Sequence, residues 1–282
     1  MSAIQPPWTC PNCKSSLSTP FCPQCGERPL PKRDLTLRGV AGKVLHATTT
    51  IDGRLMRSFA LLLRRPGFLT VAYMEGRRTP YLAPFKLFLA ANALFFAIHS
   101  LTGVNVFSSP LASHLHQQDW SVLAQSLVAT HLQSARTSLA DYAPVFDRQV
   151  VLYAKLLIVL MVLPFALLVS VVYRGARKPL MTHVSFSLHL YAFLLLLFSV
   201  CVLAGKADEL LGGAGLSEPW LDNLLSVVNL VACGAYLHVS SGPVFAARGA
   251  SRLLKAAGLA LCAGAIVIGY RFVLLPITLF TT

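Results

Sequence analysis

Residues 183–203 of the chain read HVSFSLHLYAFLLLLFSVCVL. This run contains no Asp, Glu, Lys or Arg, and nearly all of its side chains are apolar. An α-helix rises 1.5 Å per residue, so a run of about 20 apolar residues is long enough to cross the roughly 30 Å hydrocarbon core of a bilayer. The run therefore predicts a transmembrane helix.

Similar apolar runs occupy four other parts of the chain: residues 84–101, 150–173, 221–239 and 253–278. Hydrophobic residues make up 55% of the 282 residues and charged residues only 12%, whereas a soluble domain carries about 25% charged residues. We therefore expect an all-α membrane protein, with a helical bundle of about five transmembrane helices over residues 84–280 and a small zinc ribbon before it.

The charged residues of the loops alternate in sign along the chain. Three regions are basic: before the first span (Arg64, Arg65, Arg77, Arg78), between the second and third (Arg174, Arg177, Lys178), and between the fourth and fifth (Arg248, Arg252, Lys255). Loops 102–149 and 204–220 carry more acids than bases. By the positive-inside rule, we expect a cytoplasmic N-terminus and a C-terminus on the outer side of the membrane. The first ten residues lack an apolar h-region, so we expect no cleavable signal peptide.

Residues 34–82 have the spacing of amphipathic pre-membrane helices. Asp52 is placed to cap a helix in which Leu55, Phe59 and Leu62 share one side, and the Arg65-Pro66-Gly67 break ends it. Residues 1–86 hold 13 Lys and Arg against four acids, a net charge of +9. We expect this segment to lie on anionic lipids at the cytoplasmic face, with packing against the ribbon or the bundle as the alternative. Nucleic acid is an unlikely partner, because the adjacent span makes lipid the nearer polyanion.

Residues 8–28 contain two CxxC pairs, Cys10-Pro-Asn-Cys13 and Cys22-Pro-Gln-Cys25. Two such knuckles can close a tetrahedral site of four thiolates, which zinc prefers. Because four cysteine ligands leave no open position, one zinc ion there is structural. A redox pair and disulfides are the alternatives, and a reducing cytoplasm disfavours disulfides. The other cysteines, Cys201, Cys233 and Cys262, lie in predicted spans and are interpreted as packing residues.

Three stretches of the sequence together resemble a family of uncharacterised bacterial multi-pass membrane proteins with an N-terminal zinc ribbon. They are CPNC…FCPQCGER, RRPGFLTVAYMEGRRTPYLAPFKLFL and YRGARKPLMTHVSFSLHLYAF. The last two spans match in general character alone. The resemblance implies an architecture and brings no activity or catalytic residue.

Polar side chains inside predicted spans are candidates for a functional site. They are Asn92, His99, His183, His189, His238 and Arg271. The last three histidines lie at similar depth and could bind a metal or haem or relay protons; headgroup contacts and interhelical hydrogen bonds are the plainer interpretation. His99, Lys155 and Arg271 lie towards the outer side, where they could share an anion such as a lipid headgroup or small organic acid. Lys155 could instead snorkel outward.

The loop 102–149 has helical periodicity around Trp120, Leu123 and Leu127. We expect an amphipathic element on the outer leaflet or capping the bundle. Its three histidines, His114, His116 and His131, could bind a metal, but a solvated loop is the favoured interpretation.

No catalytic motif appears in the sequence, which favours a protein that is not an enzyme. The first hypothesis is an inner-membrane protein whose cytoplasmic zinc ribbon is a docking or assembly module for a protein partner. The second is a transporter or lipid- and anion-handling protein with a polar site in the bundle. The third and weakest is a His-ligated membrane metalloprotein.

Metal analysis of the purified protein tests the ribbon. We expect one zinc ion per chain, and none in a Cys10→Ser/Cys25→Ser variant, since two of four thiolates cannot hold zinc in a closed site. Zinc that remains bound to this variant would show that the metal binds at another site. Wild-type protein that contains no zinc would contradict the predicted zinc ribbon.

Overall fold

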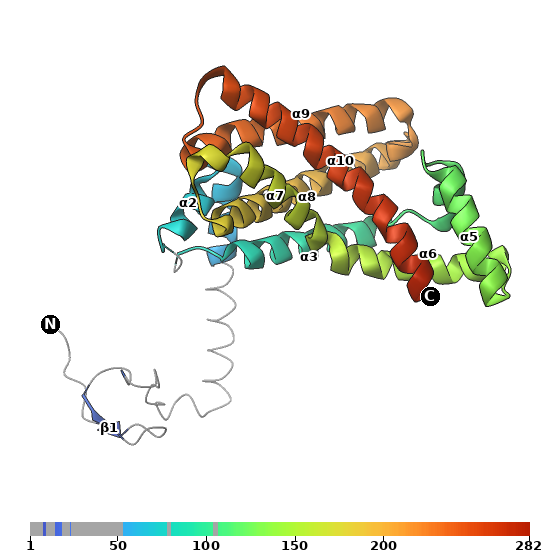
Figure 1. Ribbon diagram of the computed structural model, residues 1–282, viewed down its shortest axis with the longest axis horizontal. Helices are drawn as coiled ribbons and strands as arrows, with labels where there is room; N and C mark the ends of the chain where they lie inside the picture. The colour runs from blue at the N-terminus through green and yellow to red at the C-terminus, as the bar shows by residue number, and fades with distance from the viewer. Residues whose placement is uncertain (1–7, 10–14, 19–22, 24–52, 78–79, 104–106) are drawn as a thin grey trace. The chain divides into compact units, whose positions relative to one another are not determined.

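The computed structural model describes residues 8–9, 15–18, 23, 53–77, 80–103 and 107–282. The chain divides into two units, Met1–Arg54 and Leu55–Thr282 (Figure 1). In the first unit, strands β1 (Trp8–Thr9) and β2 (Ser16–Leu17) pair antiparallel, with Trp8 opposite Leu17 and Thr9 opposite Ser16. All four cysteines predicted to bind zinc lie outside the described residues, and so do residues 34–52 of the pre-membrane segment.

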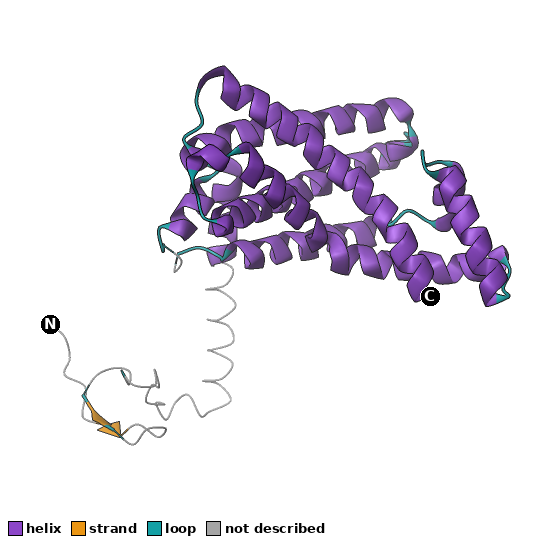
Figure 2. Ribbon diagram, viewed as in Figure 1, coloured by secondary structure: helices purple, strands orange, loops and turns teal. Residues whose placement is uncertain are grey.

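The regular secondary structure described in the second unit is helical, with short loops between the helices (Figure 2). The helix over residues 53–64 leads into this unit and is followed by α2 (Phe68–Met74), α3 (Pro84–Thr102), α4 (Leu111–His116), α5 (Ser121–Ala135), α6 (Leu139–Leu157), the 3₁₀ turn η2 (Ile158–Met161), α7 (Val162–Val172), η3 (Arg174–Ala176), α8 (Leu180–Leu210), η4 (Gly215–Ser217), α9 (Pro219–Phe245) and α10 (Gly249–Thr281).

Five helical segments are long and apolar enough to cross a membrane: Pro84–Thr102, Leu139–Val172, Leu180–Leu210, Trp220–Phe245 and Gly249–Thr281. The predicted all-α membrane bundle of five spans is thereby confirmed. Four of the five helices extend past the predicted bounds by several residues. The second begins at Leu139 instead of about 150, because Ser138 caps it by accepting a hydrogen bond from the Asp141 N–H at 3.2 Å. Apolar runs reveal the hydrocarbon-spanning core of a helix and miss its polar ends.

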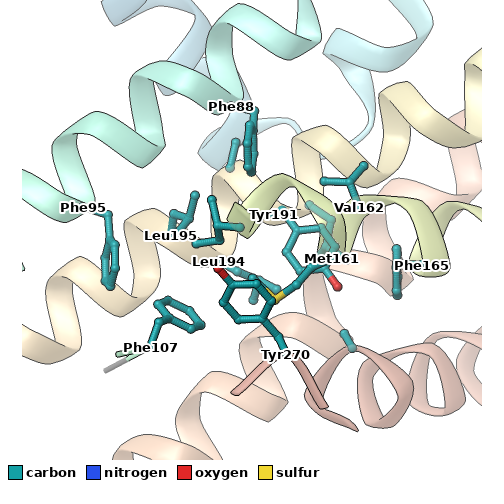
Figure 3. Packing of buried hydrophobic residues seen from close by; sticks show 14 of the residues in the cluster. Phe88, Phe95, Phe107, Met161, Val162, Phe165, Tyr191, Leu194, Leu195 and Tyr270 are labelled. Atoms are coloured by element: carbon teal, nitrogen blue, oxygen red, sulfur yellow. The ribbon is translucent and has the colours of Figure 1, made fainter. Parts of the chain in front are cut away.

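Helix α8 lies at the centre of the bundle. In its most apolar window 67% of the residues are buried, against 28% to 33% in the other four spans. Helices α3, α7 and α9 pack around it. Figure 3 shows Tyr191, Leu194 and Leu195 of α8 among Phe88 and Phe95 of α3, Phe165 of α7 and Tyr270 of α10.

The described part of the pre-membrane segment packs on the bundle. Leu62, Leu69 and Ala72 are buried, and α2 contacts α8, α9 and α3. The buried hydroxyl of Ser58 accepts a hydrogen bond from the Leu82 N–H at 3.0 Å, which fastens the segment to the start of the first span. From Leu55 onward, this segment is therefore part of the bundle's packing.

Gly67 permits the close approach of α2 to α9. Its φ is +87°, a conformation that residues with a side chain rarely adopt. A Cβ at this position would lie 2.7 Å from the Ser240 carbonyl oxygen and 2.9 Å from Cγ of Pro243. Both the backbone conformation and the space require glycine.

Replacing Gly67 with Ala tests this contact against a matched control, Gly76→Ala. Gly76 has a similar φ of +83° but no atom within 4 Å of the added Cβ. Backbone strain lowers the free energy of unfolding of both variants by about 1 kcal/mol. Overpacking lowers that of Gly67→Ala by about 1–3 kcal/mol more. Thermal unfolding in detergent should show a larger drop in Tm for Gly67→Ala. Equal drops would show that α2 does not sit against α9 as described.

Candidate functional site

Asn92 pairs with a backbone carbonyl near a break in the second span. Between α6 and α7 the helix tightens into η2, where each N–H bonds three residues back instead of four, so one carbonyl at the junction loses its usual partner. The hydroxyl of Tyr270 donates to the Ala154 carbonyl at 2.9 Å, and Nδ2 of Asn92 donates to the Lys155 carbonyl at 3.3 Å. Asn92 thus holds α3 to the broken span.

His238 takes part in a similar pairing through its backbone. Pro243 has no N–H, so the Val239 carbonyl four residues earlier has no helical partner. Arg252 of α10 supplies it: Nη2 donates to the Val239 carbonyl at 3.0 Å and Nε to the His238 carbonyl at 2.5 Å. Gly242 makes room for the guanidinium, since a Cβ there would lie 2.9 Å from Nη2. The prediction concerned the side chain of His238, whereas this contact involves its backbone carbonyl.

His183 belongs to a column of rings at the end of the bundle that carries the basic loops. The His183 ring stacks on Phe245 with centroids 5.3 Å apart, and Tyr173 stacks on the same ring at 4.3 Å. Lys255 places its Nζ 5.2 Å from the centre of the Tyr173 ring, as in a cation–π pair. His183 therefore packs as an aromatic residue between α8 and α9.

His189 is buried where α2 meets α8. Its Nδ1 shares a hydrogen bond of 2.8 Å with the hydroxyl of Thr70, and its Nε2 is a buried atom without a hydrogen-bond partner. Thr70, which sequence reasoning missed, is itself buried. The pair links the pre-membrane segment to the central helix.

The intramembrane histidines do not form a metal site in the described part of the chain. Within residues 53–77, 80–103 and 107–282, no three His, Cys, Asp or Glu side chains lie close enough together to hold a metal ion. The hypothesis of a His-ligated metalloprotein gains no support there.

His99 and Lys155, two of the three groups of the predicted anion site, meet over one ring. The buried His99 ring lies 5.8 Å from the Phe96 ring, and Nζ of Lys155 lies 5.8 Å from the centre of the same ring. The third group, Arg271, lines a cavity between other helices.

This cavity lies between α8, α9 and α10, with a volume of about 380 Å³, within the roughly 300–1,000 Å³ range of small-molecule sites. Most of its lining is apolar. Its polar lining residues are Cys201, Asp222, Ser226, Asn229, Cys233 and Arg271. Asn229 donates to the sulfur of Cys201 at 3.3 Å and to the Leu225 carbonyl at 2.9 Å. We take this cavity as the candidate functional site.

Asp222 is the member of this site that sequence reasoning missed. It lies in the first turn of α9 and lines the same cavity as Arg271. Asp222 and Arg271 thus place opposite charges on the wall of one cavity. The signal was present in the sequence: positions 222, 226, 229 and 233 are all polar or sulfur-bearing and follow the i, i+4, i+7 spacing of one helix face.

The loop between the first two spans forms a helical cap. His114 in α4 is buried between the rings of Trp120 and Phe146, and the Trp120 indole N–H donates to its Nδ1 at 3.1 Å. Trp120 also lies against Phe272, next to Arg271. Burial, with a smaller contribution from the positive charge of Arg271, lowers the pKa of His114 from 6.5 to about 4, so this ring is neutral at pH 7. The favoured interpretation of a solvated loop is wrong for His114, while His116 is exposed.

Residues 52–96 match a family described as "Protein of unknown function (DUF3667)". The matched stretch covers the described pre-membrane helices and most of α3, including Thr70 and Asn92. It supports the predicted resemblance to an uncharacterised family; the four cysteines of the predicted ribbon and the cavity residues lie outside the matched stretch. No curated protein and no solved structure matches the chain.

Proposed function

We propose that this protein handles an anionic amphiphile in the membrane, which it binds in the cavity between α8, α9 and α10. The observation that carries the proposal is Arg271, a positive charge on the wall of a mostly apolar cavity within a span. Charged residues inside spans are costly and mark binding or transport sites by default.

The chemistry of the cavity fits such a ligand. A guanidinium binds carboxylate and phosphate groups through two parallel hydrogen bonds. The apolar side chains of the lining accept hydrocarbon. A molecule with an anionic head and a hydrocarbon chain would satisfy both parts of the wall.

The cavity also has an opening on the outside of the bundle. Two of its lining residues, Leu230 of α9 and Ile268 of α10, are 40% and 56% exposed. In a lipid-embedded bundle, exposed apolar side chains face acyl chains. A ligand would therefore enter sideways from the bilayer.

We propose for the N-terminal unit a structural zinc ribbon that acts as a docking or assembly module. The pairing of β1 with β2 supports it, because Cys10 and Cys13 stand in the sequence between the two strands. The loop charges support a cytoplasmic ribbon in a bacterial inner membrane with the C-terminus outside. A closed four-cysteine site would stabilise this small unit and leave its surface for a protein partner.

Binding of dodecyl phosphate to the detergent-purified protein tests whether the cavity takes an anionic amphiphile. Native mass spectrometry measures the binding. Arg271→Gln should weaken binding by about tenfold or more, the effect of losing a charge-assisted hydrogen bond. Arg248→Gln, which changes an exposed arginine between α9 and α10, is the matched control and should bind as the wild type does. Equal binding by wild type and Arg271→Gln would contradict the proposal.

A further inference from the structure

We propose that the cavity selects a phospholipid whose head group carries both a phosphate and a primary ammonium, with Arg271 binding the phosphate and Asp222 the ammonium. This inference rests on the proposed function and narrows its ligand to one lipid class.

The first argument is the charge of the wall. Asp222 and Arg271 line the same cavity and carry opposite charges. A ligand with a phosphate alone would gain Arg271 but face repulsion from the Asp222 carboxylate. A head group with adjacent opposite charges pairs with both residues, so the wall as a whole favours a zwitterion.

The second argument concerns the kind of cation. Proteins recognise quaternary ammonium groups with cages of aromatic rings, but Phe198 is the one aromatic residue in this lining. A primary ammonium instead donates three hydrogen bonds. The cavity offers acceptors for them: the Asp222 carboxylate, and Oδ1 of Asn229, a buried atom that has no hydrogen-bond partner. The acceptors therefore suit a primary amine better than choline.

The third argument is the shape of the cavity, which suits an attached hydrocarbon chain. Leu216 of η4 closes the loop end by packing so tightly on Gly205 that a Cβ there would lie 2.6 Å from its Cγ. The side towards Leu230 and Ile268 is open. Figure 1 shows α10 crossing the bundle obliquely, from the end of α9 towards α6. A head group enclosed here would leave its acyl chains in the bilayer, so a lipid fits better than a free small zwitterion.

Competition between lipids with identical acyl chains tests the inference. The full-length protein in detergent is offered phosphatidylethanolamine, phosphatidylcholine and phosphatidylglycerol, and bound lipid is measured by native mass spectrometry. We expect the wild type to prefer phosphatidylethanolamine over each competitor by about tenfold or more, the effect of one charge-assisted hydrogen bond. Phosphatidylcholine tests which kind of cation is preferred, and phosphatidylglycerol tests a phosphate without a cation.

Asp222→Asn keeps the size of the side chain and removes its charge. This variant should lose the preference for phosphatidylethanolamine and bind phosphatidylglycerol at least as well. Glu218→Gln changes a carboxylate four residues earlier that does not line the cavity, and it should keep the wild-type preference. Because Asp222 is exposed, the Tm of the variant should stay close to that of the wild type.

The outcomes separate the two proposals. If the wild type prefers phosphatidylglycerol, or if Asp222→Asn leaves the preference unchanged, the zwitterion inference is overturned while an Arg271-dependent anion site stands. If Arg271→Gln binds all three lipids as the wild type does, the proposed function and this inference both fall.

Discussion

Backbone groups inside the hydrocarbon core have no water to bond with, so every carbonyl that a helix break releases needs a partner from the protein itself. Interruptions of the described spans include η2, which Pro164 follows, and Pro243 in α9. Tyr270 donates to Ala154 at the first, and Arg252 donates to Val239 at the second. Both donors come from α10, so this helix is fastened to α6 and to α9 through the interruptions of its neighbours.

These bonds also set the rotation of α10, and with it the position of the candidate site. Successive residues of an α-helix point about 100° apart. Tyr270 faces α6, and Arg271, the next residue, faces the cavity between α8 and α9. The cap contributes on the other side, where Trp120 packs on Phe272 and donates to the buried His114. The charge that we assign to ligand binding therefore stands between two residues that fix it in place.

The spans could be predicted from the sequence because hydropathy and length alone identify them. The two breaks were not predicted, although a proline marks each of them. Pro164, which follows residues 158–161, has no N–H for the Leu160 carbonyl, and Pro243 has none for the Val239 carbonyl. Asn92 and His238 were candidates for ligand binding; the hydrogen bonds described above join the Asn92 amide to the Lys155 carbonyl and Arg252 to the His238 carbonyl. Asp222 could have been identified from the sequence, because it belongs to the polar face of α9 that the helical spacing of this span predicts. The four cysteines of the predicted ribbon stay a prediction.

A double-mutant cycle between Pro243 and Arg252 tests most directly whether a side chain of α10 replaces the missing N–H in α9. Pro243→Ala restores an N–H that can bond Val239, so it should make Arg252→Leu less damaging. Unfolding in mixed micelles should then give a coupling free energy of about 1 kcal/mol or more between the two changes, near the upper part of the range for interhelical hydrogen bonds in membranes. Strictly additive effects would mean that Arg252 does not satisfy the released carbonyl, and the pairing on which the position of α10 depends would be wrong.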